Sequence, residues 1–163
     1  AEQGIIVQVG HTGASADVLT AYDHNGGYGH PDHIQVHRVG VAAAATRPAL
    51  RLYENTMNRD AIAAAIAENS DAVAEWAGDG ELPEIDTSAF GMPESVITHA
   101  IDVAAFTVLK REAMRAHASQ ITDDDFFMKM PEEIFARSFG TEWYIAHGKT
   151  REPGAPMEID LFA

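Results

Sequence analysis

Half of the histidines in this chain lie close together in the sequence. Four of the eight, His24, His30, His33 and His37, fall within the fifteen residues 23–37, which also hold two aspartates and three glycines. The chain has no cysteine, so a metal would have to be held by His, Asp or Glu, and a nucleophile would have to be oxygen or activated water. This density of imidazoles favours a metal or catalytic site.

The residues around these histidines predict a strand, a loop and a helix. The segment Asp17 to Tyr22 is β-branched and aromatic and precedes Asp-His-Asn-Gly-Gly, which is typical of a strand that ends in a loop. Pro31 suits the first turn of a helix that continues to Ala45. In such a helix His33 and His37 lie one turn apart on one face, a spacing that suits two ligands of one metal.

His30 differs from the other two because Pro31 follows it. The proline restricts His30 to an extended backbone, so its ring is aimed differently from the helical pair. A plainer interpretation also stays open. Asp32 and His30 then cap the helix, His33 and His37 are solvated, and the glycines serve an ordinary turn.

The rest of the chain alternates between predicted strands and helices. Further strands are expected over residues 50–53 and 95–103, further helices over 58–76, 104–121 and 131–139, and a loop over 78–93. At 163 residues the chain fits one domain. The alternation predicts an α/β fold, in which ligands bind at the C-terminal ends of parallel strands.

Charge and hydropathy exclude two classes of partner. Lys and Arg number 11 against 25 Asp and Glu, for a net charge of −14, which repels nucleic acid and anionic membranes. No run approaches the ~18 apolar residues of a membrane span, and we expect a cytoplasmic protein.

Several strings of the sequence resemble motifs of one known family. The string Gly26-Gly-Tyr-Gly-His-Pro-Asp-His33, with Thr20-Ala-Tyr-Asp23 before it, resembles the second motif of the LmbE-like zinc deacetylases. This family includes N-acetylglucosaminyl-phosphatidylinositol de-N-acetylase and the mycothiol-pathway deacetylase and conjugate amidase. Segments 115–120, 140–144 and 160–163 resemble its later motifs, so the resemblance spans nearly the whole chain.

The resemblance implies roles for four residues of the motif. His33 matches a ligand of Zn²⁺, and His30 matches the histidine that acts at the scissile amide and stabilises the oxyanion. Asp32 matches the residue that tunes this histidine, and Tyr28 matches the one that polarises the substrate carbonyl. The set is chemically coherent, because metal-activated water attacks an amide while a tyrosine and an imidazolium stabilise the developing charge.

The first motif of the family has no counterpart here. That motif, His-Pro-Asp-Asp-Glu, supplies the other two zinc ligands and the general base, and the chain contains no such string. The resemblance therefore implies that residues 1–163 are the C-terminal half of a Rossmann-like three-layer α/β domain with a mainly parallel sheet. The N-terminal half would then be a separate chain or a lost segment, and zinc held by His33 alone would lack the usual three protein ligands.

The resemblance implies a small-molecule substrate. Gly29 stands where the conjugate-amidase branch tends to have proline, which favours deacetylation of an amino sugar over cleavage of a thiol conjugate. Two alternatives stay open: an amidase that cleaves thiol conjugates, and a non-catalytic binding or assembly half-domain. A half-domain exposes apolar surface, so we expect a tight partner, with a homo-oligomer as one form of it.

The other histidines and the aromatic residues are given structural interpretations. His117 falls on the apolar side of the predicted helix 104–121 and is expected to be buried. His99 and His147 are expected to have structural roles only. The remaining set is expected to anchor the core rather than to stack on a ligand: Phe126, Phe127, Trp143 and Tyr144.

Overall fold

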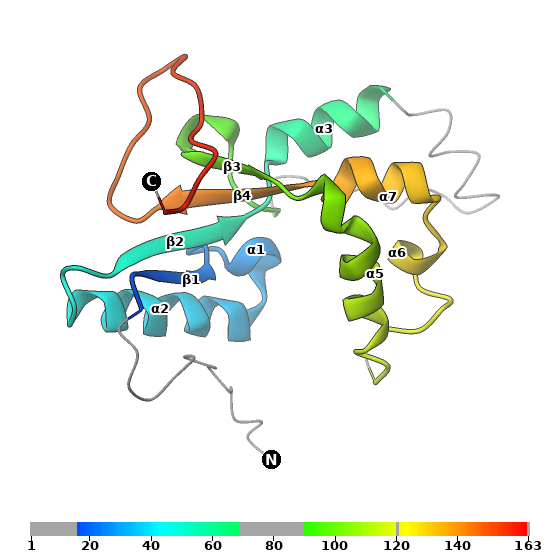
Figure 1. Ribbon diagram of the computed structural model, residues 1–163, viewed down its shortest axis with the longest axis horizontal. Helices are drawn as coiled ribbons and strands as arrows, with labels where there is room; N and C mark the ends of the chain where they lie inside the picture. The colour runs from blue at the N-terminus through cyan, green and yellow to red at the C-terminus, as the bar shows by residue number, and fades with distance from the viewer. Residues whose placement is uncertain (1–15, 69–89, 120, 163) are drawn as a thin grey trace.

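The computed structural model describes residues 16–68, 90–119 and 121–162 (Figure 1). Two short 3₁₀ turns, η2 (Glu94–Val96) and η3 (Ala104–Phe106), precede and follow the third strand. The described strands are β1 (Val18–Tyr22), β2 (Arg51–Thr56), β3 (His99–Asp102) and β4 (Thr141–Ala146). The helices are α1 (Gly26–Gly29), α2 (Pro31–Ala45), α3 (Arg59–Glu68), α5 (Thr107–Arg115), α6 (Phe126–Lys129) and α7 (Glu132–Phe139).

The described strands form one mixed sheet in the order β1-β2-β4-β3. β1 pairs with β2 in parallel, so that Ala21 lies opposite Glu54, whereas β4 is antiparallel to both β2 and β3. The α/β class is therefore confirmed. A mainly parallel sheet is not found in the described strands, because the unforeseen strand β4 inserts between β2 and β3. The Rossmann-like arrangement stays a prediction.

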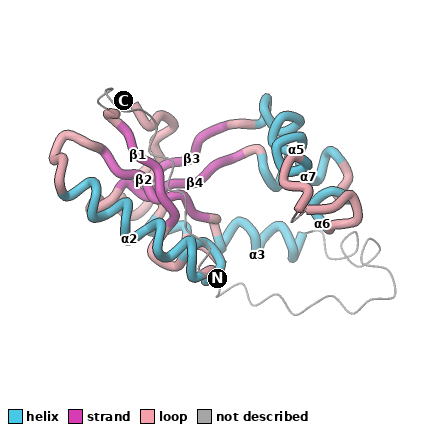
Figure 2. Tube along the Cα trace, turned by 90° about the horizontal axis from the view of Figure 1, so that it is seen from below, coloured by secondary structure: helices cyan, strands magenta, loops and turns pink. Residues whose placement is uncertain are grey.

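Helix α2 packs closely against β1 and β2, as Figures 1 and 2 show. Gly40 permits this approach, because a Cβ atom there would lie 2.8 Å from the Cβ of Ala21 and 3.8 Å from Cδ1 of Leu52. The helix begins at the predicted Pro31 and ends at the predicted Ala45. The strand, loop and helix around the histidines are thus confirmed.

The opposite face of the sheet carries the buried aromatic cluster. Tyr53, next to Leu52 on β2, faces away from α2 because successive strand residues alternate between faces. It packs with Tyr144 and Ala146 of β4 and is joined by Leu161 from the C-terminal segment. The end of the chain therefore covers this face, and the expected anchoring role of Tyr144 is confirmed.

Helices α5, α6 and α7 form a separate group at one end of the sheet (Figure 2). The prediction for α5 was wrong in two respects. The helix stops at Arg115 and not at residue 121. The apolar side of the predicted helix, a stripe that runs through Phe106 and Leu109 toward His117, is exposed, with Phe106 57% and Leu109 59% accessible. The inward side is formed by Thr107 and by Arg111, whose guanidinium lies over the Phe135 ring of α7.

His117 lies beyond the end of α5 and is exposed, so the expectation of a buried histidine was wrong. His117 was placed on the apolar side by counting helical turns, and this counting does not apply beyond Arg115, where the helix ends. Phe127 is also 44% exposed, and its ring makes a T-shaped contact with that of Phe139. The side chain of Phe126 lies outside the described residues.

The other predicted elements differ from the structure mainly in length. β2 continues to Thr56, and the strand expected over residues 95–103 is reduced to His99–Asp102. The helix 58–76 is seen as α3 up to Glu68, and the remainder, with most of the loop 78–93, lies outside the described residues. In the described ranges, no helix combines the length and apolar character needed to cross a membrane.

Candidate functional site

The residues singled out by the motif gather beyond the C-terminal end of β1. The strand ends at Tyr22, a turn leads into the short helix α1, and His30 joins α1 to α2 (Figure 1). This is the position at which α/β proteins bind ligands, because the following loop can reach across the strand end.

Asp23 fixes the loop and is completely buried. Its Oδ1 accepts a hydrogen bond from the Gly27 backbone N–H at 2.9 Å, and its Oδ2 accepts one from the Thr56 hydroxyl at 2.5 Å. Its own backbone N–H donates to the carbonyl of Asn55 at 2.9 Å. The loop is thereby tied to the end of β2. No role was predicted for Asp23, although an acidic residue directly after a predicted strand is a usable signal.

Gly26 brings the loop against the first turn of α2. Its φ of +66° is a conformation that only glycine adopts readily, and a Cβ atom would lie 2.9 Å from the backbone nitrogen of Ile34 and 3.0 Å from the Cβ of His33. The carbonyl of Gly26 is then placed to accept a hydrogen bond from the His33 ring.

His33 is held in one tautomer by this carbonyl. Its Nδ1 lies 3.1 Å from the Gly26 oxygen, and because a carbonyl can only accept, Nδ1 carries the hydrogen. In the neutral ring Nε2 then keeps its lone pair. The ring stacks on Tyr22 with a centroid distance of 3.8 Å and an interplanar angle of 4°. A histidine whose second nitrogen donates to a backbone carbonyl has the usual arrangement of a metal ligand.

Tyr22 provides the ring on which His33 stacks. Burial, and then the nearby Tyr28, raise the pKa of the Tyr22 hydroxyl above its ordinary value of 10.0. Tyr22 therefore stays neutral over the physiological range, and its ring supports the imidazole of His33 through stacking.

Tyr28 and His30 lie beside His33, as the motif implied. The ring of His30 is 4.7 Å from that of His33, and the ring of Tyr28 meets both edge-on at 5.9 and 5.3 Å. Tyr28 is 51% exposed, so it lies at the surface. Three of the four predicted site residues are thus brought together at the surface.

Asp32 contacts His30 through its backbone, and the helix capping by His30 that the plainer interpretation expected is confirmed. The backbone N–H of Asp32 donates to Nδ1 of His30 at 3.2 Å, so His30 acts as the N-cap of α2 from an extended conformation. The Asp32 side chain is exposed, and within the described ranges its carboxylate contacts no imidazole. Its role in tuning His30 stays a prediction.

The described residues do not form a complete metal site. His37 shares the helix face with His33, as predicted, and its Nδ1 is likewise bound to a backbone carbonyl, that of Tyr22 at 3.0 Å. Within the described ranges, no group of three or more His, Cys, Asp or Glu could hold a metal ion. His33 fits the chemistry of a zinc ligand, whereas a catalytic zinc site needs three protein ligands.

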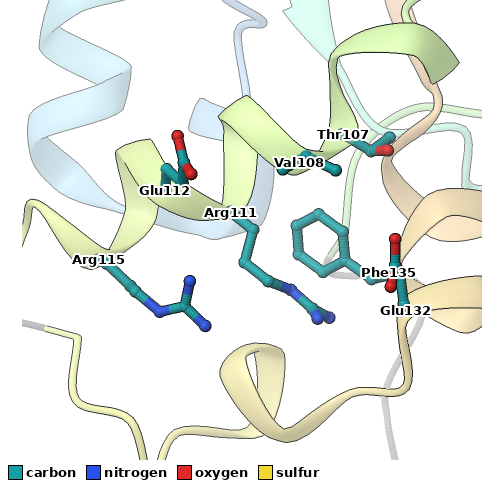
Figure 3. A pocket seen from close by; sticks show the side chains of 7 residues that line it. All are labelled: Thr107, Val108, Arg111, Glu112, Arg115, Glu132 and Phe135. Carbon is teal, nitrogen blue, oxygen red and sulfur yellow. The ribbon is translucent and has the colours of Figure 1, made fainter.

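A cavity lies between α5 and α7 and holds none of the motif residues. Figure 3 shows Arg111 extending beside the ring of Phe135, with Arg115 one turn further along α5. The cavity has a volume of about 220 Å³. Arg111 donates from Nη2 to the carbonyl of Met130 at 2.6 Å, so its guanidinium serves the packing of α5 on the segment before α7. The lining residues are Thr107, Val108, Arg111, Glu112, Arg115, Glu132 and Phe135.

The chain is an α/β protein whose motif residues lie at the C-terminal end of a parallel strand. No family model matches the chain. Comparison with curated proteins nevertheless shows clear relatives. The chain is 43% identical over 149 residues to the 1D-myo-inositol 2-acetamido-2-deoxy-alpha-D-glucopyranoside deacetylase of Acidothermus cellulolyticus. It is 39% identical over 163 residues to the deacetylase of the same name from Streptomyces avermitilis, and 36% over 159 residues to that from Geodermatophilus obscurus.

These matches cover 89 to 90% of this chain and 51 to 54% of the relatives. The chain is thus similar over most of its length to proteins named as deacetylases, in agreement with the resemblance of its motif. It spans about half the length of the curated relatives it matches.

Proposed function

We propose that the chain is the C-terminal half of a zinc-dependent N-deacetylase that hydrolyses the N-acetyl group of an amino sugar and is active only together with the N-terminal half. The observation that carries this proposal is the ring cluster at the end of β1. There His33 is held with Nδ1 on the Gly26 carbonyl, and Tyr28 and His30 stand beside it.

The residues of the cluster have complementary chemistry. His33 would contribute Nε2 as one ligand of zinc, and the N-terminal half would supply the rest. Bound zinc provides Lewis acidity for the hydrolysis of an amide. The Tyr28 hydroxyl and the His30 imidazole can donate hydrogen bonds to the oxygen on which negative charge develops. His30 has Nδ1 occupied as an acceptor, so the neutral ring carries its hydrogen on Nε2.

The names of the relatives and the loop geometry support an amino-sugar substrate. The relatives are named for a 2-acetamido-2-deoxy-glucopyranoside, which is an N-acetylated amino sugar. Gly29 has a φ of +82°, which proline cannot adopt because its ring fixes φ near −65°. The loop in this conformation therefore cannot hold the proline that the conjugate-amidase branch tends to have at position 29.

The proposal is tested by completing the domain. The chain is co-expressed with the N-terminal half of the Acidothermus cellulolyticus relative, and the purified pair is assayed for zinc and for acetate release from the substrate named for that relative. We expect zinc in the pair and release of acetate. Tyr28→Phe should lower kcat by roughly 10² to 10³. Tyr144→Phe, the same change at a buried tyrosine of the core, should leave kcat unchanged.

Other outcomes would identify the alternatives. A pair that cleaves a thiol-conjugate amide but releases no acetate from the amino sugar would be an amidase. A pair that assembles without zinc and without hydrolysis would contradict the catalytic proposal and favour a binding or assembly half-domain.

A further inference from the structure

A buried carboxylate joins three elements beneath helix α2. Glu54 of β2 has a side chain only 9% exposed, and it lies on the same face of the strand as Leu52, toward α2. Its Oε1 is 2.6 Å from Nδ1 of His147, just after β4, and its Oε2 is 3.7 Å from Nδ1 of His37 on α2. One side chain thus links β2, the end of β4 and the middle of α2.

A buried position of this kind is energetically unfavourable for a carboxylate. Removal of a charge from water costs several kcal/mol unless partners compensate it, and a well-packed apolar side chain is often at least as stable in such a place. An apolar residue would serve packing against α2, as Leu52 does two residues earlier. Packing alone therefore does not account for Glu54, whereas a requirement to hold the two imidazoles does.

His37 connects this carboxylate to the site. Its Nδ1 lies 3.0 Å from the carbonyl oxygen of Tyr22, so Nδ1 carries a hydrogen that it donates to this carbonyl, while Oε2 of Glu54 lies 3.7 Å from the same nitrogen. One turn earlier on α2, His33 uses its Nδ1 in the same way on the carbonyl of Gly26. Two imidazoles at a spacing of four residues thus attach α2 to the backbone that follows β1. Of these two, His37 is the one braced by Glu54.

We propose that Glu54 is a positioning residue for His33. It keeps His37 on the Tyr22 carbonyl, and this contact fixes the rotation of α2 about its axis. The fixed helix in turn keeps Nδ1 of His33 on the Gly26 carbonyl and leaves Nε2 with its lone pair. The consequence for zinc rests on the proposed function, but the state of the His33 ring does not.

The test reads the His33 ring directly in the whole chain. Long-range ¹H–¹⁵N spectra of the histidine-labelled chain distinguish an imidazole fixed with hydrogen on Nδ1 from one that exchanges between tautomers. The unaltered chain should show His33 fixed. Glu54→Gln keeps an oxygen for one imidazole but turns an NH₂ group toward the other donor, so one link is lost. We expect the ¹⁵N shifts of His33 to move toward averaged values in this variant, although residue 54 does not contact His33.

Glu142→Gln is the matched control. Glu142 is also a carboxylate between two side-chain donors, since it accepts from Lys110 at 2.9 Å and from the Tyr144 hydroxyl at 2.8 Å, but its partners do not touch α2. This variant should leave the His33 shifts unchanged. If Glu54→Gln does not fold, His147→Ala removes one partner from the more exposed side and should shift His33 in the same direction by a smaller amount. A folded variant of either kind with an unaltered His33 tautomer would overturn the proposal.

A zinc titration of the completed pair separates this proposal from the proposed function. Glu54→Gln should lower zinc affinity about 10- to 100-fold, the range for residues that orient a metal-bound histidine. A shifted His33 ring in a pair that binds no zinc would leave Glu54 as a positioning residue and would reject the zinc enzyme. A shifted ring with unchanged zinc affinity would overturn the link to His33 as a ligand.

Discussion

Two histidines on different parts of the sheet show how similar local contacts can serve different ends. At the end of β1, the ring of His33 stacks on that of Tyr22 with a centroid distance of 3.8 Å. On β3, the rings of His99 and Tyr53 form a T-shaped contact with a centroid distance of 4.8 Å. Each also has one hydrogen bond at Nδ1. His33 is only half-buried, whereas His99 is 6% exposed. Burial therefore separates a surface site from a core position, although each residue is a histidine in contact with a tyrosine ring.

The hydrogen-bond partners also differ in kind. The partner of His33 is a carbonyl, which can only accept and so sets the tautomer of the ring. The partner of His99 is the hydroxyl of Thr98 at 2.7 Å, which can donate or accept and so sets no tautomer. Burial lowers the pKa of His99 below its ordinary value of 6.5. The region at β1 holds a ring nitrogen in a defined state at the surface, while the region at β3 uses an imidazole as a neutral part of the core.

The largest expected effect concerns zinc. In the completed pair, His33→Ala should lower zinc affinity by more than about 100-fold, because loss of a ligand must exceed the ~10- to 100-fold effect of an orienting residue. His99→Gln should bind zinc as the unaltered pair does. Isothermal titration with Zn²⁺ measures both. Equal affinities for the two variants would remove the distinction between the two regions.

The next effect concerns the loop that carries the site. Asp23→Ala leaves the Gly27 N–H and the Thr56 hydroxyl without their buried acceptor, so the free energy of unfolding should fall by roughly 2–4 kcal/mol. Asp32→Ala, an exposed aspartate of the same motif, should change it by less than about 0.5 kcal/mol. Urea unfolding gives both values. A small loss for Asp23→Ala would mean that the loop is held by its backbone contacts alone.

A third prediction concerns the seating of the helix that carries His33. Gly40→Ala places a methyl group 2.8 Å from the Cβ of Ala21 and should destabilise the chain by about 1–3 kcal/mol through overpacking. Adding Ala21→Gly removes the clash and should recover part of this loss, which the unfolding midpoints of the single and double variants would show. If the double variant were as unstable as the sum of the single ones, the contact between α2 and β1 would not set the position of the helix.

The region around His33 was predictable because its signals are local. A β-branched strand, a turn rich in glycine and a proline in the first helical turn all lie within Asp17 to Ala45, and each fixes the backbone near itself. The bond from Asp23 to Thr56 joins residues 33 positions apart, so no local pattern reveals it. The same applies to Glu54, whose partners His37 and His147 come from two other elements.

The opposite side of the molecule was predicted less well because its elements depend on distant partners. Strand β4 follows Gly140 directly and is defined by pairing with both β2 and β3, which are far away in the sequence. The stripe through Phe106 and Leu109 has helical spacing, yet periodicity does not say which side of a helix will meet a neighbour. The side that packs here is the one with Thr107 and Arg111.

The smallest expected effect is a pH dependence that belongs to His99. Burial lowers its pKa below 6.5, an effect that Lys149 reinforces and Glu158 opposes. The unfolded chain therefore binds a proton at this residue more readily than the folded chain does. The stability contribution of neutral His99 is complete above pH 6.5 and declines as the pH falls from there toward the lowered pKa of the folded state.

His99→Gln removes this titration and should flatten the decline. The free energy of unfolding is measured by urea at about pH 7.5 and about pH 5.5, on either side of the ordinary histidine pKa. The unaltered chain should lose more stability between the two values than His99→Gln does. His24→Gln, at an exposed histidine, should behave like the unaltered chain. An equal loss for His99→Gln and the unaltered chain would show that His99 is not kept neutral by the core, and the contrast with His33 would then rest on exposure alone.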